Sequence, residues 1–241
     1  MPFHALPPAD AEALWLTLRL AGATTAVLLA LALPLAWWIA AGSGPVRALV
    51  QALVALPLVI PPTVIGFYLL VALGPATAAG RLITRLLGHT LAFSFAGLLA
   101  GSLVYSLPFA VQPLVAGFRS LGADLLDAAA GLGAPPLLAF RKIVLPLSWG
   151  SVVVAAVLTF THTVGEFGVV LMLGGDLPGS TRTLSVALYD QVQDFLYAAA
   201  NRTALLLVLL SLLGLSAIYW RSAQSDRRRQ AGNSESARDV V

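Results

Sequence analysis

The chain has 241 residues, of which 59% are hydrophobic and only 10% are charged, and its mean hydropathy is +0.88. A soluble globular domain carries about 25% charged residues, so this composition excludes an ordinary soluble protein and indicates residence in a lipid bilayer. A net charge of +3 is too small to indicate nucleic-acid binding. The absence of cysteine excludes disulfides and thiolate metal sites, and the three histidines share no metal-ligand spacing. We therefore expect no metal and no cofactor.

The long uncharged stretches of the chain predict its membrane helices. Crossing about 30 Å of hydrocarbon takes about 20 apolar residues. Five stretches reach this length, and they predict spanning helices near residues 14–41, 48–73, 91–117, 145–173 and 201–220. The expected fold class is all-α, a polytopic bundle of about five transmembrane helices. The second stretch contains Pro57, Pro61 and Pro62, and it is long enough for a tilted or broken helix but not for two spans.

The distribution of basic residues predicts the orientation, because cytoplasmic loops carry an excess of Lys and Arg. With the C-terminus in the cytoplasm, nine basic residues face the cytoplasm and five face outward. The cytoplasmic set is Arg47, Arg119, Arg141, Lys142, Arg221, Arg227, Arg228, Arg229 and Arg238, and the outer set is Arg19, Arg81, Arg85, Arg182 and Arg202. We therefore expect an extracytoplasmic segment at 1–13 without a cleavable signal peptide, a transmembrane domain at 14–221 and a disordered cytoplasmic tail at 222–241.

The cytoplasmic loop 119–146 has its own predicted structure of two short helices joined by a glycine turn. Residues 124–130 are rich in alanine and leucine, which favour helix. Gly131 and Gly133 are expected to end this helix. Pro135 and Pro136 suit the start of a second helix, and residues 141–142 are basic, as is favourable at a helix end.

The same loop resembles the coupling motif of ABC importer permeases, in which E-A-A is followed by a glycine four residues on, nine further residues, and I-x-L-P. The matching residues are Asp127, Ala128, Ala129, Gly133, Ile143, Leu145 and Pro146. Asp127 departs from the pattern by replacing glutamate, which keeps the charge but shortens the side chain. The resemblance implies that the loop docks on a nucleotide-binding subunit and transmits its motion on ATP binding.

The chain is not expected to hydrolyse ATP itself. A P-loop requires Gly-x-x-x-x-Gly-Lys-Ser/Thr, whereas the only lysine, Lys142, is followed by Ile143. We therefore expect a transport subunit, not an enzyme, whose ATPase is a separate polypeptide.

Three further segments narrow the resemblance: the proline-rich stretch 56–66, the Gly-Glu-Phe-Gly sequence at 165–168, and the outer loop 178–184, which is followed by Ala187 and Tyr189. From about Trp15 to Leu215 the chain resembles the permease subunits of bacterial molybdate ABC transporters. Sulfate and thiosulfate permeases share much of this pattern, and tungstate is a dianion of the same shape as molybdate.

The resemblance implies an assembly in the bacterial cytoplasmic (inner) membrane. It implies a homodimer with the path along its two-fold axis, two ATPase subunits beneath, and an extracytoplasmic oxyanion-binding protein. No nucleic acid takes part.

Candidate residues of the path or its gate are Thr159, His162, Thr163 and Glu166, together with Pro61 and Pro62. The first four are spaced i, i+3, i+4, i+7 and would share one helix face. Polar groups within a span usually face the bundle or a water-filled path, although interhelical hydrogen bonding would explain them equally well. An ionised Glu166 would repel a dianion, so we expect it to pair with a donor or to support a gate.

Other interpretations remain open at this point. Arg182 could receive an anion, contact the binding protein, or be a solvated loop charge. An intramembrane serine protease would need a serine in a Gly-x-Ser-x-Gly-like sequence. The neighbouring residues of Ser94, Ser102 and Ser106 do not form such a sequence. A passive channel would leave the pattern from Asp127 to Pro146 unexplained.

Overall fold

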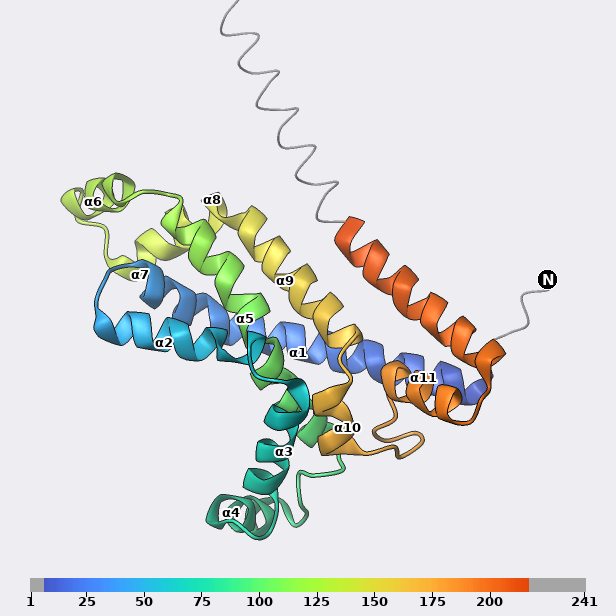
Figure 1. Ribbon diagram of the computed structural model, residues 1–241. Coiled ribbons are helices and arrows are strands. Elements are labelled where there is room, and N and C mark those ends of the chain that lie inside the picture. Colours follow the sequence, from blue (N-terminus) through green and yellow to red (C-terminus); the bar gives the residue numbers. More distant parts are fainter. Residues whose placement is uncertain (1–6, 217–241) are drawn as a thin grey trace, which may run out of the picture.

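The computed structural model describes residues 7–216, and within this range it contains helices but no strands (Figure 1). The expected tail at 222–241 and the first six residues lie outside the described range. The helices are α1 (Pro8–Ala40), α2 (Pro45–Ala55), η1 (Leu56–Leu58), α3 (Pro62–Leu73), α4 (Ala78–Leu87), α5 (Phe95–Arg119), α6 (Ala123–Gly131), α7 (Pro136–Ala139), η2 (Phe140–Val144), α8 (Leu145–Leu147), α9 (Trp149–Val164), α10 (Gly168–Gly174), α11 (Leu184–Gln193) and a last helix, Tyr197–Ser216.

Three of these helices, α1, α5 and Tyr197–Ser216, are long and apolar enough to cross a membrane unaided. Two pairs of shorter helices pass the same test only together, each bent sharply at a short break. With each bent pair taken as one span the described chain has up to five candidate spans. The predicted all-α membrane bundle is therefore confirmed.

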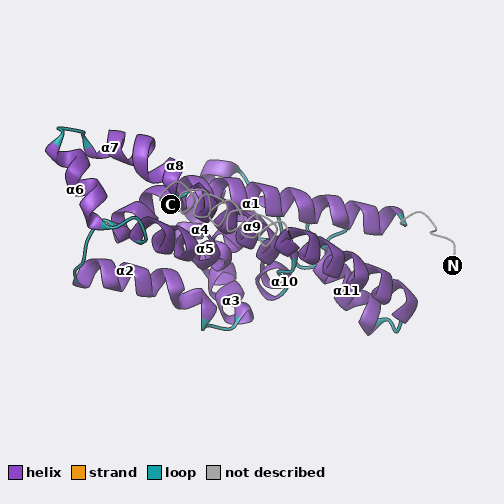
Figure 2. Cartoon of the chain, turned by 90° about the horizontal axis from the view of Figure 1, so that it is seen from above, coloured by secondary structure: helices purple, strands orange, loops and turns teal. Residues whose placement is uncertain are grey.

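The core of the bundle is formed by α1, α5 and α9, which lie side by side in both views (Figure 2). Its buried side chains include Leu28, Ile39, Leu114 and Ala155. Small residues on α1, such as Ala32, are fully buried where α1 packs against α5 and α9. In lipid, helices associate through close van der Waals packing, which small residues permit.

The second predicted span, 48–73, is not one continuous helix. The segments Pro45–Leu58 and Pro62–Leu73 meet at an angle of 108°. Pro61 precedes α3 and Pro62 is its first residue. Neither proline carries a backbone N–H, and each ring clashes with the carbonyl of a preceding helical turn, so the helix ends before them and a new one starts in another direction.

The fourth predicted span, 145–173, is also broken. The helix Pro136–Leu147 meets α9 at 74°, and α9 ends at Val164 before α10 begins at Gly168. A Cβ atom added to Gly168 would lie 3.0 Å from the Pro62 ring. The break between α9 and α10 therefore packs directly on the break between α2 and α3.

Glycine at position 66 allows α3 to approach α10 closely, and we expect Gly66→Val to be destabilising. A Cβ atom there would lie 2.7 Å from the Cβ of Met172 and 3.1 Å from the Cα of Val169. Overpacking of this kind costs about 1–3 kcal/mol. Thermal unfolding in detergent should show a lower midpoint for Gly66→Val and an unchanged midpoint for Gly22→Ala, since Gly22 has open space around it. Equal midpoints for Gly66→Val and the parent would contradict this account of the packing.

Candidate functional site

The loop 119–146 folds as predicted, as a helix, a glycine turn and a second helix. The turn after α6 supplies backbone N–H groups that donate hydrogen bonds to the last carbonyl oxygens of that helix. The Gly133 N–H donates to the Ala130 carbonyl (2.9 Å), and the Ala134 N–H donates to the Ala129 carbonyl (3.0 Å). This pair of bonds is a Schellman motif. It requires the left-handed φ of +78° that Gly133 adopts, so the turn explains the glycine of the motif.

The second helix of the loop is longer than expected. Pro135 precedes it and Pro136 is its first residue, as predicted, but the helical run continues to Leu147. Arg141 and Lys142 therefore lie inside the run, in a π-helical turn, and their predicted place at a helix end is wrong. The ring of Pro146 would clash with the carbonyl four residues earlier in a regular α-helix, which accounts for the wider turn there.

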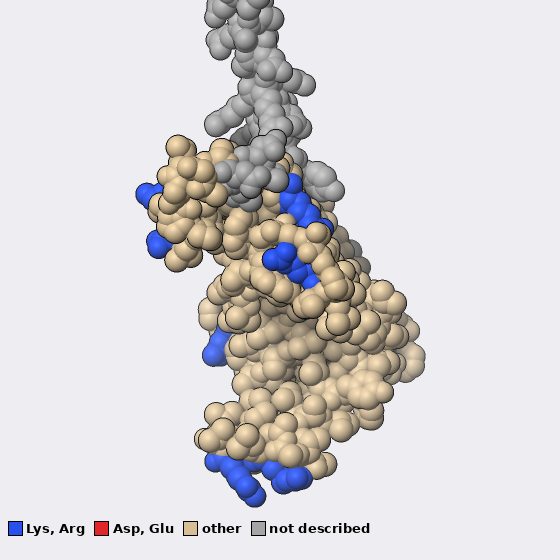
Figure 3. Space-filling view, turned by 90° about the vertical axis from the view of Figure 1, so that its left-hand side faces the viewer, with Lys and Arg blue, Asp and Glu red and all other residues tan. Residues whose placement is uncertain are grey.

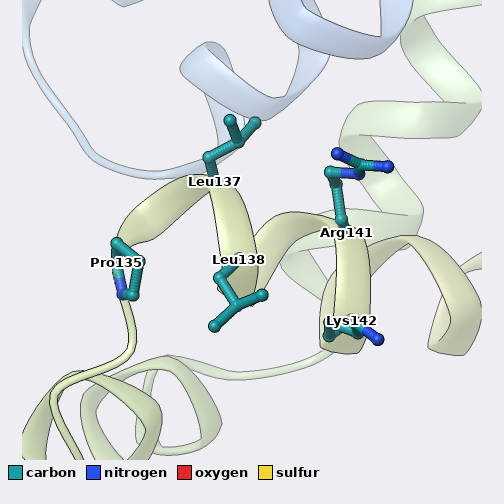
Figure 4. A pocket seen from close by; sticks show the side chains of 5 residues that line it. All are labelled: Pro135, Leu137, Leu138, Arg141 and Lys142. Carbon is teal, nitrogen blue, oxygen red and sulfur yellow. The ribbon is translucent and has the colours of Figure 1, made fainter.

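The loop presents an apolar surface with a basic edge. Leu132, at the turn, is 89% exposed, and Leu137 and Leu138 are also exposed. A hollow of about 650 Å³ beside them is lined by Pro135, Leu137, Leu138, Arg141 and Lys142 (Figure 4). Exposed leucines next to cations are typical of a protein-binding surface.

Some of the predicted coupling residues hold this surface in place. Leu145 packs against the core of the bundle, as does Phe140, whose ring lies 5.5 Å from that of Trp37. Ala129 is buried at the turn. The loop is thus attached firmly to α1 and α5 at one end, while α6 projects away from the bundle (Figure 1).

A second candidate site lies where the two helix breaks meet. It is a cleft of about 470 Å³, lined by Pro62, Thr63, Tyr105, Thr161, His162, Gly165, Glu166, Phe167 and Gly168. The structure thus brings three of the predicted path residues together: Pro62, His162 and Glu166. Pro61, Thr159 and Thr163 do not line the cleft.

A hydrogen-bond network behind the cleft joins α5 to α9. The Ser106 hydroxyl lies 2.9 Å from Nδ1 of His162 and 3.0 Å from the Thr163 hydroxyl. Thr163 also lies 2.9 Å from the Thr159 carbonyl. The His162 ring stacks on Phe109 with their centroids 3.9 Å apart. For Thr163, therefore, the structure supports interhelical hydrogen bonding.

Glu166 differs from the other members of the predicted stripe. It lies after the end of α9, between α9 and α10, so the assumed helical spacing is wrong at this position. The residue is 3% exposed, and within residues 7–216 neither carboxyl oxygen has a hydrogen-bond partner. Its backbone carbonyl accepts a bond of 2.5 Å from Ser185 on α11. Leaving a buried ionised group without a partner costs several kcal/mol, so this carboxyl is costly to hold in its ionised form.

Arg182 is neither a solvated loop charge nor free to bind an anion. Its guanidinium contacts Asp176 at 2.5 Å and Asp190 at 2.6 Å. The hydrogen bond that Arg182 donates to Asp190 raises the pKa of Arg182, with a further contribution from the bond to Asp176. Burial and the neighbouring Asp176 raise the pKa of Asp190. The arginine therefore bridges the carboxylates of Asp176 and Asp190 and offsets part of their negative charge.

We expect Arg182→Gln to lower stability by about 1 kcal/mol near neutral pH, because Asp176 and Asp190 would then repel each other. At acid pH both carboxyls are protonated and the variant should approach the parent. Since the pKa of Asp190 is already raised, this convergence should begin above the usual aspartate range. The difference in unfolding midpoint, measured against pH, checks this. Arg202→Gln on the last helix removes the same charge as a control, and a difference that is constant with pH would contradict the account.

Several residues of the cleft region were not predicted. Tyr105, Ser106 and Phe109 lie on α5, within a long uncharged stretch that showed no distinctive spacing. Ser185 lies on α11, a helix that was interpreted as part of an outer loop. Their roles arise from contacts between segments far apart in sequence.

Comparison with known proteins decides the family. The family described as "binding-protein-dependent transport system inner membrane component" matches residues 32–230. The chain belongs to this family. One relative of the chain is the molybdenum transport system permease protein ModB of Azotobacter vinelandii. It is 48% identical to this chain over 224 residues, which are 92% of this chain and 96% of that protein.

Two further similarities are weaker. The sulfate transport system permease protein CysT of Salmonella typhimurium is 29% identical over 194 residues, 80% of this chain and 70% of that protein. A chain from the crystal structure of a bacterial ABC transporter involved in alginate import has a TM-score of 0.68 at 19% identity, covering 92% of this chain and 80% of that one. The latter likeness shows the fold alone.

Proposed function

We propose that the chain is the transmembrane subunit of an ATP-driven importer that moves molybdate into the cytoplasm. The observation that carries this proposal is the 48% identity to a molybdenum permease over nearly the full length of both chains. The 29% identity to a sulfate permease covers less of either chain. Sulfate, thiosulfate or another oxyanion is the alternative cargo, and tungstate would be accepted with molybdate because the two dianions share one shape.

The loop from Asp127 to Pro146 is the proposed contact with a separate ATPase. Its Schellman turn sets the angle between α6 and α7. The exposed leucines and the basic edge offer an apolar surface with a charged margin to a partner protein. In this proposal two ATPase subunits close when they bind ATP, and their closure moves the Asp127–Pro146 loop of each permease copy. This movement opens the translocation cavity of the dimer toward the outside, and ATP hydrolysis returns the dimer to its starting state.

The proposed assembly is a homodimer with an external oxyanion-binding protein. Five spans are few to enclose a path, so a second copy would complete it. Lys and Arg counting supports a cytoplasmic C-terminus and an N-terminus outside, with residues 14–221 as the permease domain and 222–241 as a cytoplasmic tail. The cleft at the meeting helix breaks is the candidate gate, since broken helices at membrane depth are tolerated where they line a cavity.

Whole-cell uptake tests the cargo. Cells that lack their own molybdate permease would receive this chain with its ATPase and binding protein. Labelled molybdate should accumulate, and unlabelled tungstate should compete far better than sulfate. Strong competition by sulfate, or accumulation of labelled sulfate in place of molybdate, would favour the alternative cargo.

A further inference from the structure

The short helix α4 has a one-sided surface that the proposed transport function does not use. Leu82, Leu86 and Leu87 are exposed, with Leu82 at 58% and Leu86 at 76%. Arg81 and Arg85 are one helical turn apart on this helix, and Nη1 of Arg81 donates to the Ala76 carbonyl at 2.8 Å, which leaves its other nitrogens to bind a ligand. The helix sequence contains no acidic residue. Such a combination of apolar and basic faces is typical of helices that lie in a membrane interface.

The helix is held rigidly at the end of α3. The Thr77 hydroxyl caps α4 by accepting a bond of 3.0 Å from the Gly80 N–H, and it donates to the Ala72 carbonyl of α3 at 2.6 Å. A Cβ atom at Gly80 would overlap the Gly74 carbonyl, so only glycine permits this close turn. α4 is seen end-on in Figure 1, whereas α3 runs down the page toward it. The turn thus fixes α4 at a steep angle to α3.

The position of α4 matches the outer end of a membrane span. It ends at Leu87, close in sequence to Phe95, where the spanning helix α5 begins. The guanidinium of Arg19 on α1 lies 4.4 Å from the Phe95 ring centroid, and a charged group in such a helix marks the level at which hydrocarbon gives way to headgroups. α4 also lies at the opposite end of the molecule from α6 (Figure 1).

The surroundings of α4 favour lipid as its partner. The adjoining helix α3 exposes Phe67, Tyr68 and Val71, so the apolar face of α4 continues a larger apolar surface. Basic side chains gather at the lower end of the molecule, where α4 lies, and no acidic side chain is visible beside them (Figure 3). Guanidinium groups bind phosphate oxygens in a bidentate manner.

We propose that α4 is an interfacial helix that inserts Leu82, Leu86 and Leu87 between lipids of the outer leaflet and binds anionic phospholipid headgroups through Arg81 and Arg85. The helix thereby anchors α3 to the membrane surface. Because α3 packs on α10 at the cleft, this anchor holds one side of the candidate gate at a fixed depth.

Depth-dependent quenching tests the insertion. The chain has no cysteine, so a single Leu86→Cys variant of the full chain can carry an environment-sensitive fluorophore in nanodiscs. Val71→Cys on α3 serves as a lipid-facing reference, and Leu132→Cys at the α6–α7 turn serves as an aqueous reference. Spin-labelled lipids should quench the label at 86 nearly as strongly as that at 71, and far more strongly than that at 132.

The headgroup preference is tested with the same label. Spin-labelled phosphatidylglycerol should be enriched around position 86 at least about fivefold over spin-labelled phosphatidylcholine. Arg81→Gln with Arg85→Gln should abolish this preference while the quenching by total lipid persists. A label at 86 that is shielded from water yet not quenched by lipid would show that a second copy or another protein covers α4, and it would overturn the proposal. A water-exposed label, or a preference retained in the arginine variant, would do the same.

Discussion

Replacing Gly133 with proline is expected to abolish docking of the ATPase subunit and with it all ATP-dependent transport. Gly133 has a φ of +78°, which proline cannot adopt, and its N–H makes one of the two bonds of the Schellman turn. Gly133→Ala keeps the N–H but places a side chain in the left-handed region, which costs about 1–2 kcal/mol. We expect Gly133→Ala to weaken docking about tenfold and Gly133→Pro to eliminate it. Co-purification of the ATPase with the tagged permease measures both.

The neighbouring glycine provides a matched control. Gly131 has open space around the position of a Cβ atom and no left-handed φ, and it lies in helix α6, which alanine favours. Gly131→Ala should therefore retain the ATPase fully. If folded Gly133→Pro protein still co-purifies with the ATPase, the turn at Gly133 is not needed for docking, and the proposed role of this turn is wrong.

Replacing Glu166 with glutamine is expected to slow molybdate uptake about tenfold, a change of about 1.4 kcal/mol in the equilibrium that opens the cleft, and to flatten the dependence of uptake on pH. The side chain is buried at the junction of α9 and α10 and lines the cleft. The substitution keeps the shape and removes the ionisable group, so it tests charge and protonation and leaves packing unchanged. Initial uptake rates across a range of pH give the measurement.

Thr159→Val is the control for this variant. Thr159 is fully buried, and its hydroxyl has no hydrogen-bond partner among residues 7–216, yet it does not line the cleft. Loss of this hydroxyl should leave uptake unchanged. If Glu166→Gln transports as fast as the parent at every pH, Glu166 has no part in the gate.

The loop 119–146 could be predicted in detail because its structure is local. Alanine-rich sequence, two glycines and two prolines determine a helix, a turn and a second helix over neighbouring residues. The one error, at Arg141 and Lys142, arose because Pro146 widens the helix without ending it. Local propensity identifies where a helix starts more reliably than how a proline inside it is accommodated.

The cleft could not be predicted because it depends on contacts between distant segments. The prolines at 61 and 62 indicated a possible break, but the bend of 108° and the contact of Pro62 with Gly168 exist only in the packed fold. Glu166 was assigned to a helix face that ends two residues before it. The partners of Arg182 lie six residues before and eight after it, a spacing that no regular element would have indicated.

The α4 surface could not be predicted from the sequence for a different reason. In the sequence alone Arg81 and Arg85 indicate only membrane topology, and the leucines between and after them belong to neighbouring apolar stretches. Their arrangement on one short helix becomes informative once Thr77 and Gly88 are seen to bound that helix.

The most direct test of the central proposal is ATP-dependent uptake of labelled molybdate into proteoliposomes that contain this chain and its ATPase, with the oxyanion-binding protein outside. We predict accumulation against a gradient with ATP inside, none with a non-hydrolysable analogue, and none when the chain carries Gly133→Pro. Equal uptake with and without ATP would identify a passive channel and contradict the account.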